Sequence, residues 1–532
     1  MELAPPAGRR RAPVRAALAV ACIAVLATAC GDAGPTPTPR PTPTEAPTAT
    51  PVPVIDLPVP DADTATAQVL LKSADGTYDV YASVGQLQGA SSTCTAVLLD
   101  TGASTTAPAY ALTNGHCVGI FGANELVLDR AETGVSVAFD WFIDRPQHRV
   151  VPVAKVAWAS MRTTDLAVLE LGATPDELRG LGVKGWRPEA LPAGGGASVD
   201  VVMLGVPVGA PVVDIPEDQR FLRLGTCSLD ADAVLLNERQ WLWPHALRND
   251  CPEVLPGNSG SAVLDRSTGG LIGLINTTTY KGEQGAECWL GRPCEVTDSG
   301  ESSLPDTSYA QPVAGIEGCF GADGMFALSA GCPLDPGGGI TSLDGAPLAV
   351  NPATRDPVSG EPSQATWRTT VVPAGTTTAY RYKIGPIAGT ACADEAGYGA
   401  AIPVATPIDD PLPTTEQRLL LCVVADGGSP ANAAIAVAFI DTTPPDAQIR
   451  FSVDGNASSG WRIEPLFNPP ELSMFMVKVG PSRATDCADP AGYVPYRRIP
   501  VNVPGAQAPA RFCAIGYDDA SNPSKPAFKV LR

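Results

Sequence analysis

The spacing of the cysteines places the strongest limit on how this chain can fold. Of 14 cysteines, twelve follow residue 30, and they occur as six pairs of near neighbours. An even number of cysteines in an exported chain is typical of disulfides. Sequence alone does not fix the connectivity, but pairing consecutive cysteines is simplest because each crosslink then lies within one predicted domain. The expected disulfides are Cys94–Cys117, Cys227–Cys251, Cys288–Cys294, Cys319–Cys332, Cys392–Cys422 and Cys487–Cys513.

The first 30 residues have the pattern of a bacterial export signal. Four arginines precede an apolar run of 14 residues, Ala16–Ala29, which is too short for a confident membrane span. The run ends in LATAC, which resembles a lipobox with Cys30 as the lipidated residue, although Leu26 lies one position earlier than the usual pattern. Residues 1–30 therefore predict a lipoprotein signal peptide, and the alternative is plain secretion after cleavage near Ala29.

Composition indicates a soluble chain of mainly β structure. Residues 31–60 are rich in proline and threonine and predict an extended tether without a core. The chain holds 53 glycines and 54 prolines, and β-branched residues recur throughout, which favours strands joined by many turns. The net charge of −20 argues against a nucleic-acid partner and against an anionic lipid surface.

Three short motifs contain residues suited to nucleophilic catalysis. His116 lies in TNGHC after an apolar strand, Asp165 begins the apolar strand DLAVLEL, and Ser259 lies in GNSGSAV. A carboxylate at a strand head can fix the tautomer of an imidazole, and glycines beside a serine permit a tight turn with free backbone N–H groups. The other two histidines, His148 and His245, lie in no comparable setting, and we interpret them as structural.

In this order the three motifs resemble the chymotrypsin/trypsin-like serine proteases, over residues 61–336. The resemblance implies a double β-barrel in which His116 is the general base, Asp165 orients it and Ser259 attacks the substrate. It also implies an oxyanion hole formed by the N–H groups of Gly257 and Ser259, a protein or peptide substrate, and no cofactor or metal. The alternative is a catalytically inactive surface-binding protein with the same fold.

The specificity pocket and the activation mode are less directly encoded. By its spacing from Ser259, Glu253 lies where the resemblance places the pocket base, although an exposed loop acid is an equally open interpretation. Ile275 and Asn276 belong to a strand expected to line the pocket. Asn258 stands where trypsin-like zymogens have an aspartate that pairs with a newly cleaved N-terminus. We therefore expect local hydrogen bonds to order the oxyanion loop without activation cleavage.

A repeat follows the protease-like region. YRYKIGP returns as FMVKVGP, and CADEAGY returns as CADPAGY, with an offset of 95 residues from Cys392 to Cys487. Two strand-rich units with one cysteine pair each predict tandem β-sandwiches of immunoglobulin or fibronectin type, over 345–441 and 446–532. Whether they bind a surface ligand or only space the enzyme stays open. We expect an all-β, monomeric, exported protein. Its lipid anchor would hold it at the extracellular face of the cell membrane, and the alternative is a secreted protein.

Overall fold

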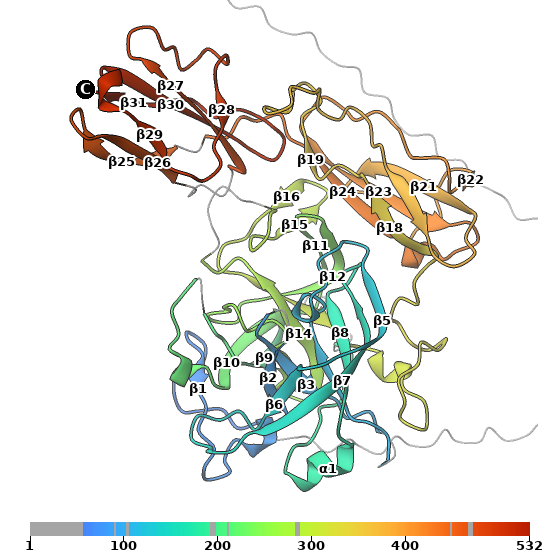
Figure 1. The fold of residues 1–532 in the computed structure, drawn as a ribbon. Coiled ribbons are helices and arrows are strands. Elements are labelled where there is room, and N and C mark those ends of the chain that lie inside the picture. Colours follow the sequence, from blue (N-terminus) through green and yellow to red (C-terminus); the bar gives the residue numbers. More distant parts are fainter. Residues whose placement is uncertain are drawn as a thin grey trace, which may run out of the picture. The chain divides into compact units, whose positions relative to one another are not determined.

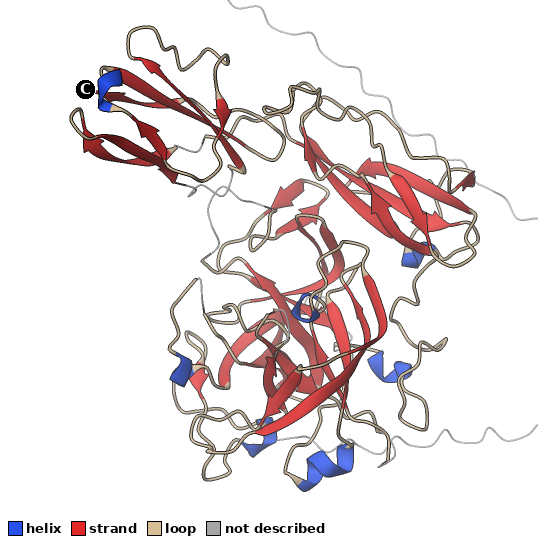
Figure 2. Cartoon of the chain, viewed as in Figure 1, coloured by secondary structure: helices blue, strands red, loops and turns tan. Residues whose placement is uncertain are grey.

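The computed structural model describes residues 57–532 except 90–91, 103–105, 192–197, 210–211, 282–287, 447–448 and 467–471. The predicted export signal, Cys30 and nearly all of the tether lie outside these residues. Strands account for most of the regular structure (Figure 2). Among the described residues, no helix is long and apolar enough to cross a membrane.

The first barrel is a sheet with the strand order β5-β7-β6-β2-β3-β4-β8, closed into six strands by the pairing of β7 with β8 (Figure 1). Both faces of β3 are buried: Cys94, Ala96 and Leu98 face one core, whereas Val97 and the following Leu99 face another. The strands are β2 (Val84–Gln88), β3 (Cys94–Leu98), β4 (Tyr110–Thr113), β5 (Leu126–Ala131), β6 (Ser136–Phe139), β7 (Arg149–Ser160) and β8 (Leu166–Leu171).

The second barrel has the order β10-β9-β13-β14-β17-β12 and is closed by the pairing of β10 with β12. Val202, Leu204 and Leu264 share a core with Val97 and Leu112 of the first barrel, so the two barrels pack on each other. The strands of this sheet are β1 (Val69–Leu70), β9 (Ser198–Gly205), β10 (Arg223–Asp230), β11 (Val234–Glu238), β12 (Trp241–Asn249), β13 (Ala262–Asp265), β14 (Leu271–Thr278), β15 (Cys294–Thr297), β16 (Gly300–Ser302) and β17 (Ser308–Pro312).

Two sandwiches with separate cores follow, which we call module 1 (residues 340–440) and module 2 (residues 449–531). Module 1 contains β18 (Ile340–Asp344), β19 (Ala349–Val350), β20 (Thr370–Pro373), β21 (Ala379–Pro386), β22 (Ile402–Pro403), β23 (Gln417–Ala425) and β24 (Ala434–Ile440). Module 2 contains β25 (Arg450–Asn456), β26 (Gly460–Leu466), β27 (Met474–Pro481), β28 (Val494–Pro495), β29 (Val501–Val503), β30 (Ala510–Tyr517) and β31 (Ala527–Leu531).

Helices are few and short. The described residues contain one α-helix, α1 (Pro175–Gly180), whose Thr174 and Glu177 form a reciprocal N-terminal cap. The 3-10 turns are η1 (Asp79–Tyr81), η2 (His116–Val118), η3 (Glu217–Gln219), η4 (Ile316–Cys319), η5 (Pro430–Asn432) and η6 (Gly505–Gln507).

Every cysteine of the described residues is joined to its nearest neighbour in the sequence. The disulfides are Cys94–Cys117, Cys227–Cys251, Cys288–Cys294, Cys319–Cys332, Cys392–Cys422 and Cys487–Cys513. Four crosslink the two-barrel region, and each module contains one.

Candidate active site

His116 lies at the start of η2, directly after the first-barrel strand β4. The Cys94–Cys117 disulfide ties this turn to β3. Gly115 is needed beside it because a Cβ atom there would lie 2.4 Å from the carbonyl oxygen of Ser160. The turn that carries the histidine is therefore fixed by a crosslink on one side and by close backbone packing on the other.

A buried carboxylate holds His116 through two hydrogen bonds. The Nδ1 atom of His116 lies 2.6 Å from Oδ2 of Asp165, and its backbone N–H donates to Oδ1 at 3.0 Å. Asp165 is 1% exposed, whereas the imidazole is 24% exposed. Burial opposes charging of the ring, but the Asp165 carboxylate outweighs burial and holds the pKa of His116 above its ordinary value. This arrangement leaves Nε2 to face reacting groups.

The Ser259 turn depends on the glycines that flank it. Gly257 (φ 98°) and Gly260 (φ 82°) both adopt left-handed backbone conformations. A Cβ atom would lie 2.6 Å from the Val206 carbonyl oxygen at Gly257, and 2.1 Å from the Thr95 carbonyl oxygen at Gly260. Both crowded positions exclude side chains, so the glycines of GNSG are required by the packing of this turn.

Thr95 joins the same turn to the first barrel through two hydrogen bonds. Its N–H donates to the Ser259 carbonyl at 2.8 Å, and its hydroxyl donates to the Gly257 carbonyl at 2.9 Å. Among the described residues, neither the Gly257 nor the Ser259 N–H donates to a backbone carbonyl. The turn thus points its carbonyls inward and leaves two neighbouring donors for another acceptor.

His116, Asp165 and Ser259 line one cavity of about 1140 Å³. No hydrogen bond joins Ser259 Oγ to His116 within the described residues, and Nε2 lies 3.7 Å from the Cys117 sulfur. Nucleophile–base hydrogen bonds in ligand-free sites are often long and tighten in the substrate complex. The shared cavity places both side chains where one substrate could reach them.

The cavity includes two of the three residues expected in the specificity pocket. Ile275 and Asn276 line it, but Glu253 does not. Glu253 has φ 48°, and its carboxylate accepts a hydrogen bond from the backbone N–H of Gln68 at 3.3 Å. The Glu253 side chain therefore contacts the Gln68 backbone, and its role as the base of the specificity pocket stays a prediction.

Sequence reasoning missed Glu238, another carboxylate that lines the cavity. It is 3% exposed, and its Oε1 accepts from the Gly291 N–H at 2.8 Å. Its Oε2 has no hydrogen-bond partner among the described residues, and burial raises the pKa of the group. Glu238 therefore adds a buried carboxyl group to the cavity that His116 lines. No motif marks this residue, because it becomes significant only where β11 meets the cavity.

Module 1 also contributes to the cavity. Glu416, Arg418, Phe439 and Asp441 line its far side. Arg418 is held by Glu301 of β16, with Nε 2.7 Å from the carboxylate, and by the ring of Phe439, 4.1 Å from the guanidinium carbon. No sequence pattern predicted that this repeat would border the site.

In the described residues, only Cys94, His116 and Cys117 lie close enough together to resemble a metal-ligand group. The two cysteines form a disulfide with each other. Because a disulfide sulfur is not a thiolate ligand, this group does not form a metal centre.

Comparison with known families agrees with this geometry. Residues 94–274 match the model of the trypsin-like peptidase domain. The match and the two closed barrels confirm the predicted fold class, an all-β chain with a trypsin-like double barrel followed by two β-sandwiches. A search of curated proteins found no significant match.

Several solved structures are similar to the chain at low identity. The protease Anisep from Arthrobacter nicotinovorans is 12% identical, with a TM-score of 0.27, and the match covers 44% of this chain and 91% of that protein. An inactivated protease paralogue of the scabies mite is 15% identical, with a TM-score of 0.28 and the same coverage. Human heparin binding protein is 12% identical, with a TM-score of 0.29, over 48% of this chain and 93% of that one. Similarity at this level carries no inference about activity.

Proposed function

We propose that the protein is an exported serine endopeptidase that cleaves peptide bonds through His116, Asp165 and Ser259. The observation that supports this most directly is the buried Asp165 carboxylate, which binds both the ring and the backbone of His116 in a cavity that also contains Ser259. The peptidase-domain match over residues 94–274 supports the same reaction class.

The geometry supports acyl transfer in two steps. Nδ1–H of His116 donates to Asp165, so Nε2 can accept the proton of Ser259 as Oγ attacks the substrate carbonyl. The N–H groups of Gly257 and Ser259 would receive the resulting oxyanion, and His116 would return its proton to the leaving amine. Water then repeats the sequence on the acyl-enzyme and releases Ser259. Since the base must begin neutral, turnover requires a pH above the raised pKa of His116.

The proposal includes location and the role of the modules. Six disulfides fit an oxidising, exported environment. We place the protein on the outer face of the membrane, held by a lipid on Cys30 and extended on the tether of residues 31–60. Module 1 would act as part of the substrate cavity, because Arg418 and Asp441 line it together with the catalytic side chains.

The decisive test is the reaction itself. Purified full-length protein should hydrolyse members of a peptide library and react covalently with a fluorophosphonate probe. Ser259→Ala should abolish labelling and lower turnover by about 10⁶-fold, because the residues of a triad act as one unit. His245→Ala is the matched control, since His245 is exposed on β12 and should leave turnover unchanged. A folded wild-type protein that neither hydrolyses peptides nor labels would instead support an inactive binding protein.

A further inference from the structure

A buried glutamine far away in the sequence reaches the turn that carries Ser259. Gln68 is 5% exposed and directly precedes β1, which pairs with β10 through Val69 and Leu224. Its Nε2 lies 3.0 Å from the Pro252 carbonyl oxygen and 2.8 Å from the Glu253 carbonyl oxygen. The side-chain amide of Gln68 therefore donates hydrogen bonds to two backbone carbonyls of the loop that leads to Ser259.

The same amide meets the side chain of Asn258. Gln68 Nε2 lies 3.2 Å from Asn258 Oδ1, and Asn258 Nδ2 donates back to Gln68 Oε1 at 3.4 Å. Asn258 also accepts from the Leu255 N–H at 3.0 Å and donates to Ser261 Oγ at 3.3 Å. The expectation of purely local bonds is thus incomplete, because one partner of this loop lies 190 residues away.

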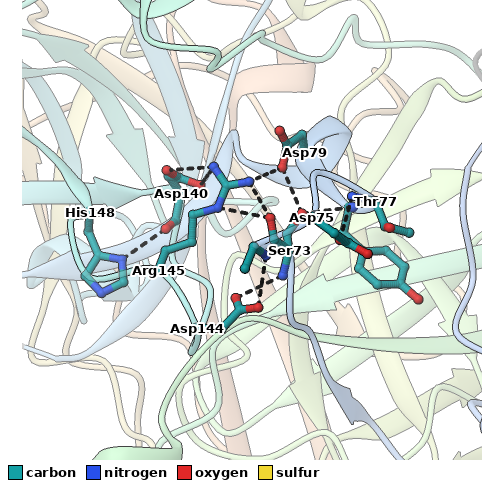
Figure 3. Close-up of polar contacts among 10 residues, drawn as sticks. Ser73, Asp75, Thr77, Asp79, Asp140, Asp144, Arg145 and His148 are labelled. Atoms are coloured by element: carbon teal, nitrogen blue, oxygen red, sulfur yellow. Dashed lines mark hydrogen bonds and ion pairs between the residues drawn. The ribbon is translucent and has the colours of Figure 1, made fainter.

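The segment after Gln68 is anchored independently (Figure 3). The N–H groups of Ser73 and Ala74 donate to the Asp144 carboxylate, each at 2.9 Å. Arg145 donates to the Ser73 carbonyl and pairs with the Asp79 and Asp140 carboxylates. Since β1 pairing also fixes the chain at Val69, Gln68 is held in place by structure that does not belong to the Ser259 loop.

We propose that Gln68 is the positioning residue of the oxyanion hole. The N–H groups of Gly257 and Ser259 would bind the oxyanion. These two residues flank Asn258, whose side chain contacts Gln68. Removal of the amide would leave the Pro252 and Glu253 carbonyls without this donor in a buried setting, and the loop would relax to recover hydrogen bonds. The two N–H groups would then move away from the position that the developing charge occupies.

The neutrality of this contact is consistent with the expectation that the oxyanion loop becomes ordered without activating cleavage. Gln68 and Asn258 are both neutral amides, so their contact buries no ion, whereas an ammonium buried without a partner would be strongly destabilising. Because Gln68 lies within the chain, its contacts form on folding and require no new terminus. The inference rests on the proposed peptidase function.

The test compares turnover with binding in the full-length protein. Gln68→Met retains side-chain volume and removes both polar groups, and Gln68→Ala removes the side chain. Both should lower kcat by about 10- to 100-fold and slow fluorophosphonate labelling by the same factor, because a single oxyanion donor is worth about 10²–10³ in rate. KM should change by less than about threefold, since substrate binding elsewhere in the cavity is retained.

A charged replacement separates positioning from folding. Gln68→Lys with Asn258→Asp replaces the neutral pair by an ion pair and should recover kcat to within about threefold of wild type. Gln68→Lys alone should not recover it. Gln88→Ala, whose amide donates to Gln86 on β2, is the matched control and should retain full turnover.

The possible outcomes can be distinguished. If Gln68→Met and Gln68→Ala both fold and keep kcat within about twofold of wild type, Gln68 does not position the oxyanion hole. If they do not fold, the double variant decides the question: a folded but inactive double variant overturns the proposal, and an active one supports it. If wild type itself neither labels nor turns over, the proposed function has failed.

Discussion

The two modules share a fold but differ in what covers the same pair of strands. In module 1, Cys422 pairs with Ile435 across β23 and β24, and in module 2, Cys513 pairs with Phe528 across β30 and β31. The disulfide cysteines thus make Ile435 and Phe528 equivalent positions. Ile435 is 1% exposed and Phe528 is 59% exposed.

The peptidase domain covers this face of module 1. Leu242 and Val296 of the second barrel share a hydrophobic core with Leu420, Ile435 and Val437. At the equivalent positions of module 2, Arg511 replaces Leu420, and its guanidinium lies over the Phe528 ring at 5.3 Å. An apolar face packs on the barrel, while its copy is capped by a long cationic side chain.

Polar contacts also join module 1 to the two-barrel region. Asn124 of the peptidase domain donates to the Ile435 carbonyl and accepts from its N–H, both at 2.6 Å. Arg162, which is 1% exposed, donates to the Ile340 carbonyl and pairs with Asp335. These bonds tie the backbone of β24 and β18 to the two-barrel region. A few outward-facing residues therefore decide whether a module packs on the two-barrel region, because the sandwich core does not.

The largest difference between the modules should appear in the free energy of unfolding when the same charged residue is placed at each of the two equivalent positions. Ile435→Asp buries a carboxylate among apolar side chains and should cost about 3–5 kcal/mol in the free energy of unfolding or detach module 1. Phe528→Asp should change it by less than about 0.5 kcal/mol, because its site is exposed. Urea unfolding monitored by tryptophan fluorescence measures both. Equal effects would mean that the two faces are equally buried or equally open.

An intermediate effect is expected from the ion pair across the module 1 contact. Arg418→Leu leaves Glu301 without its cation and should cost about 2–3 kcal/mol, whereas adding Glu301→Leu should restore most of the loss. Pro509 occupies the matching place in module 2, which therefore offers no such cation. Thermal unfolding of the single and double variants tests the coupling. A double variant as unstable as the sum of both singles would show that the pair does not interact.

The smallest effect concerns pH at the junction of the modules. Burial raises the pKa of Asp441 to about 6, and the Asp518 and Glu416 carboxylates add to the shift. Because the folded pKa exceeds the unfolded value, the ionised group destabilises the fold, and stability is lost as pH rises from about 4 to about 6. Asp441→Asn should leave stability unchanged at pH 4 and raise it at pH 7, by about 1 kcal/mol for a half-exposed, solvent-screened group.

The control for this titration lies in module 2. Asp518→Asn removes a like charge from Asp441 and should shift the pH window of the effect downward. Stability measured by urea unfolding from pH 4 to pH 8 gives both curves. A pH-independent difference between wild type and Asp441→Asn would rule out a raised Asp441 pKa and, with it, the tight junction.

Several features of the chain were predictable because they depend on composition and short-range patterns. Recurring β-branched residues among many glycines and prolines predicted strands joined by turns. GNSG predicted a tight turn, since Gly257 and Gly260 are the residues that tolerate its left-handed backbone. Glu253 could not be placed in the same way, because counting positions back from Ser259 does not reveal the left-handed backbone at Glu253.

The sequence by itself determined the all-β class, the repeat and the three motif residues, because each is written in neighbouring positions or in fixed spacings. Only the tertiary structure decided the contacts of Gln68, the burial of Glu238 and the covered face of module 1. Each of these joins residues that lie far apart in the chain, as Gln68 and Asn258 do across 190 positions. A single buried amide or an outward-facing leucine leaves no periodic signal, and it acquires its role only when folding removes water from both partners.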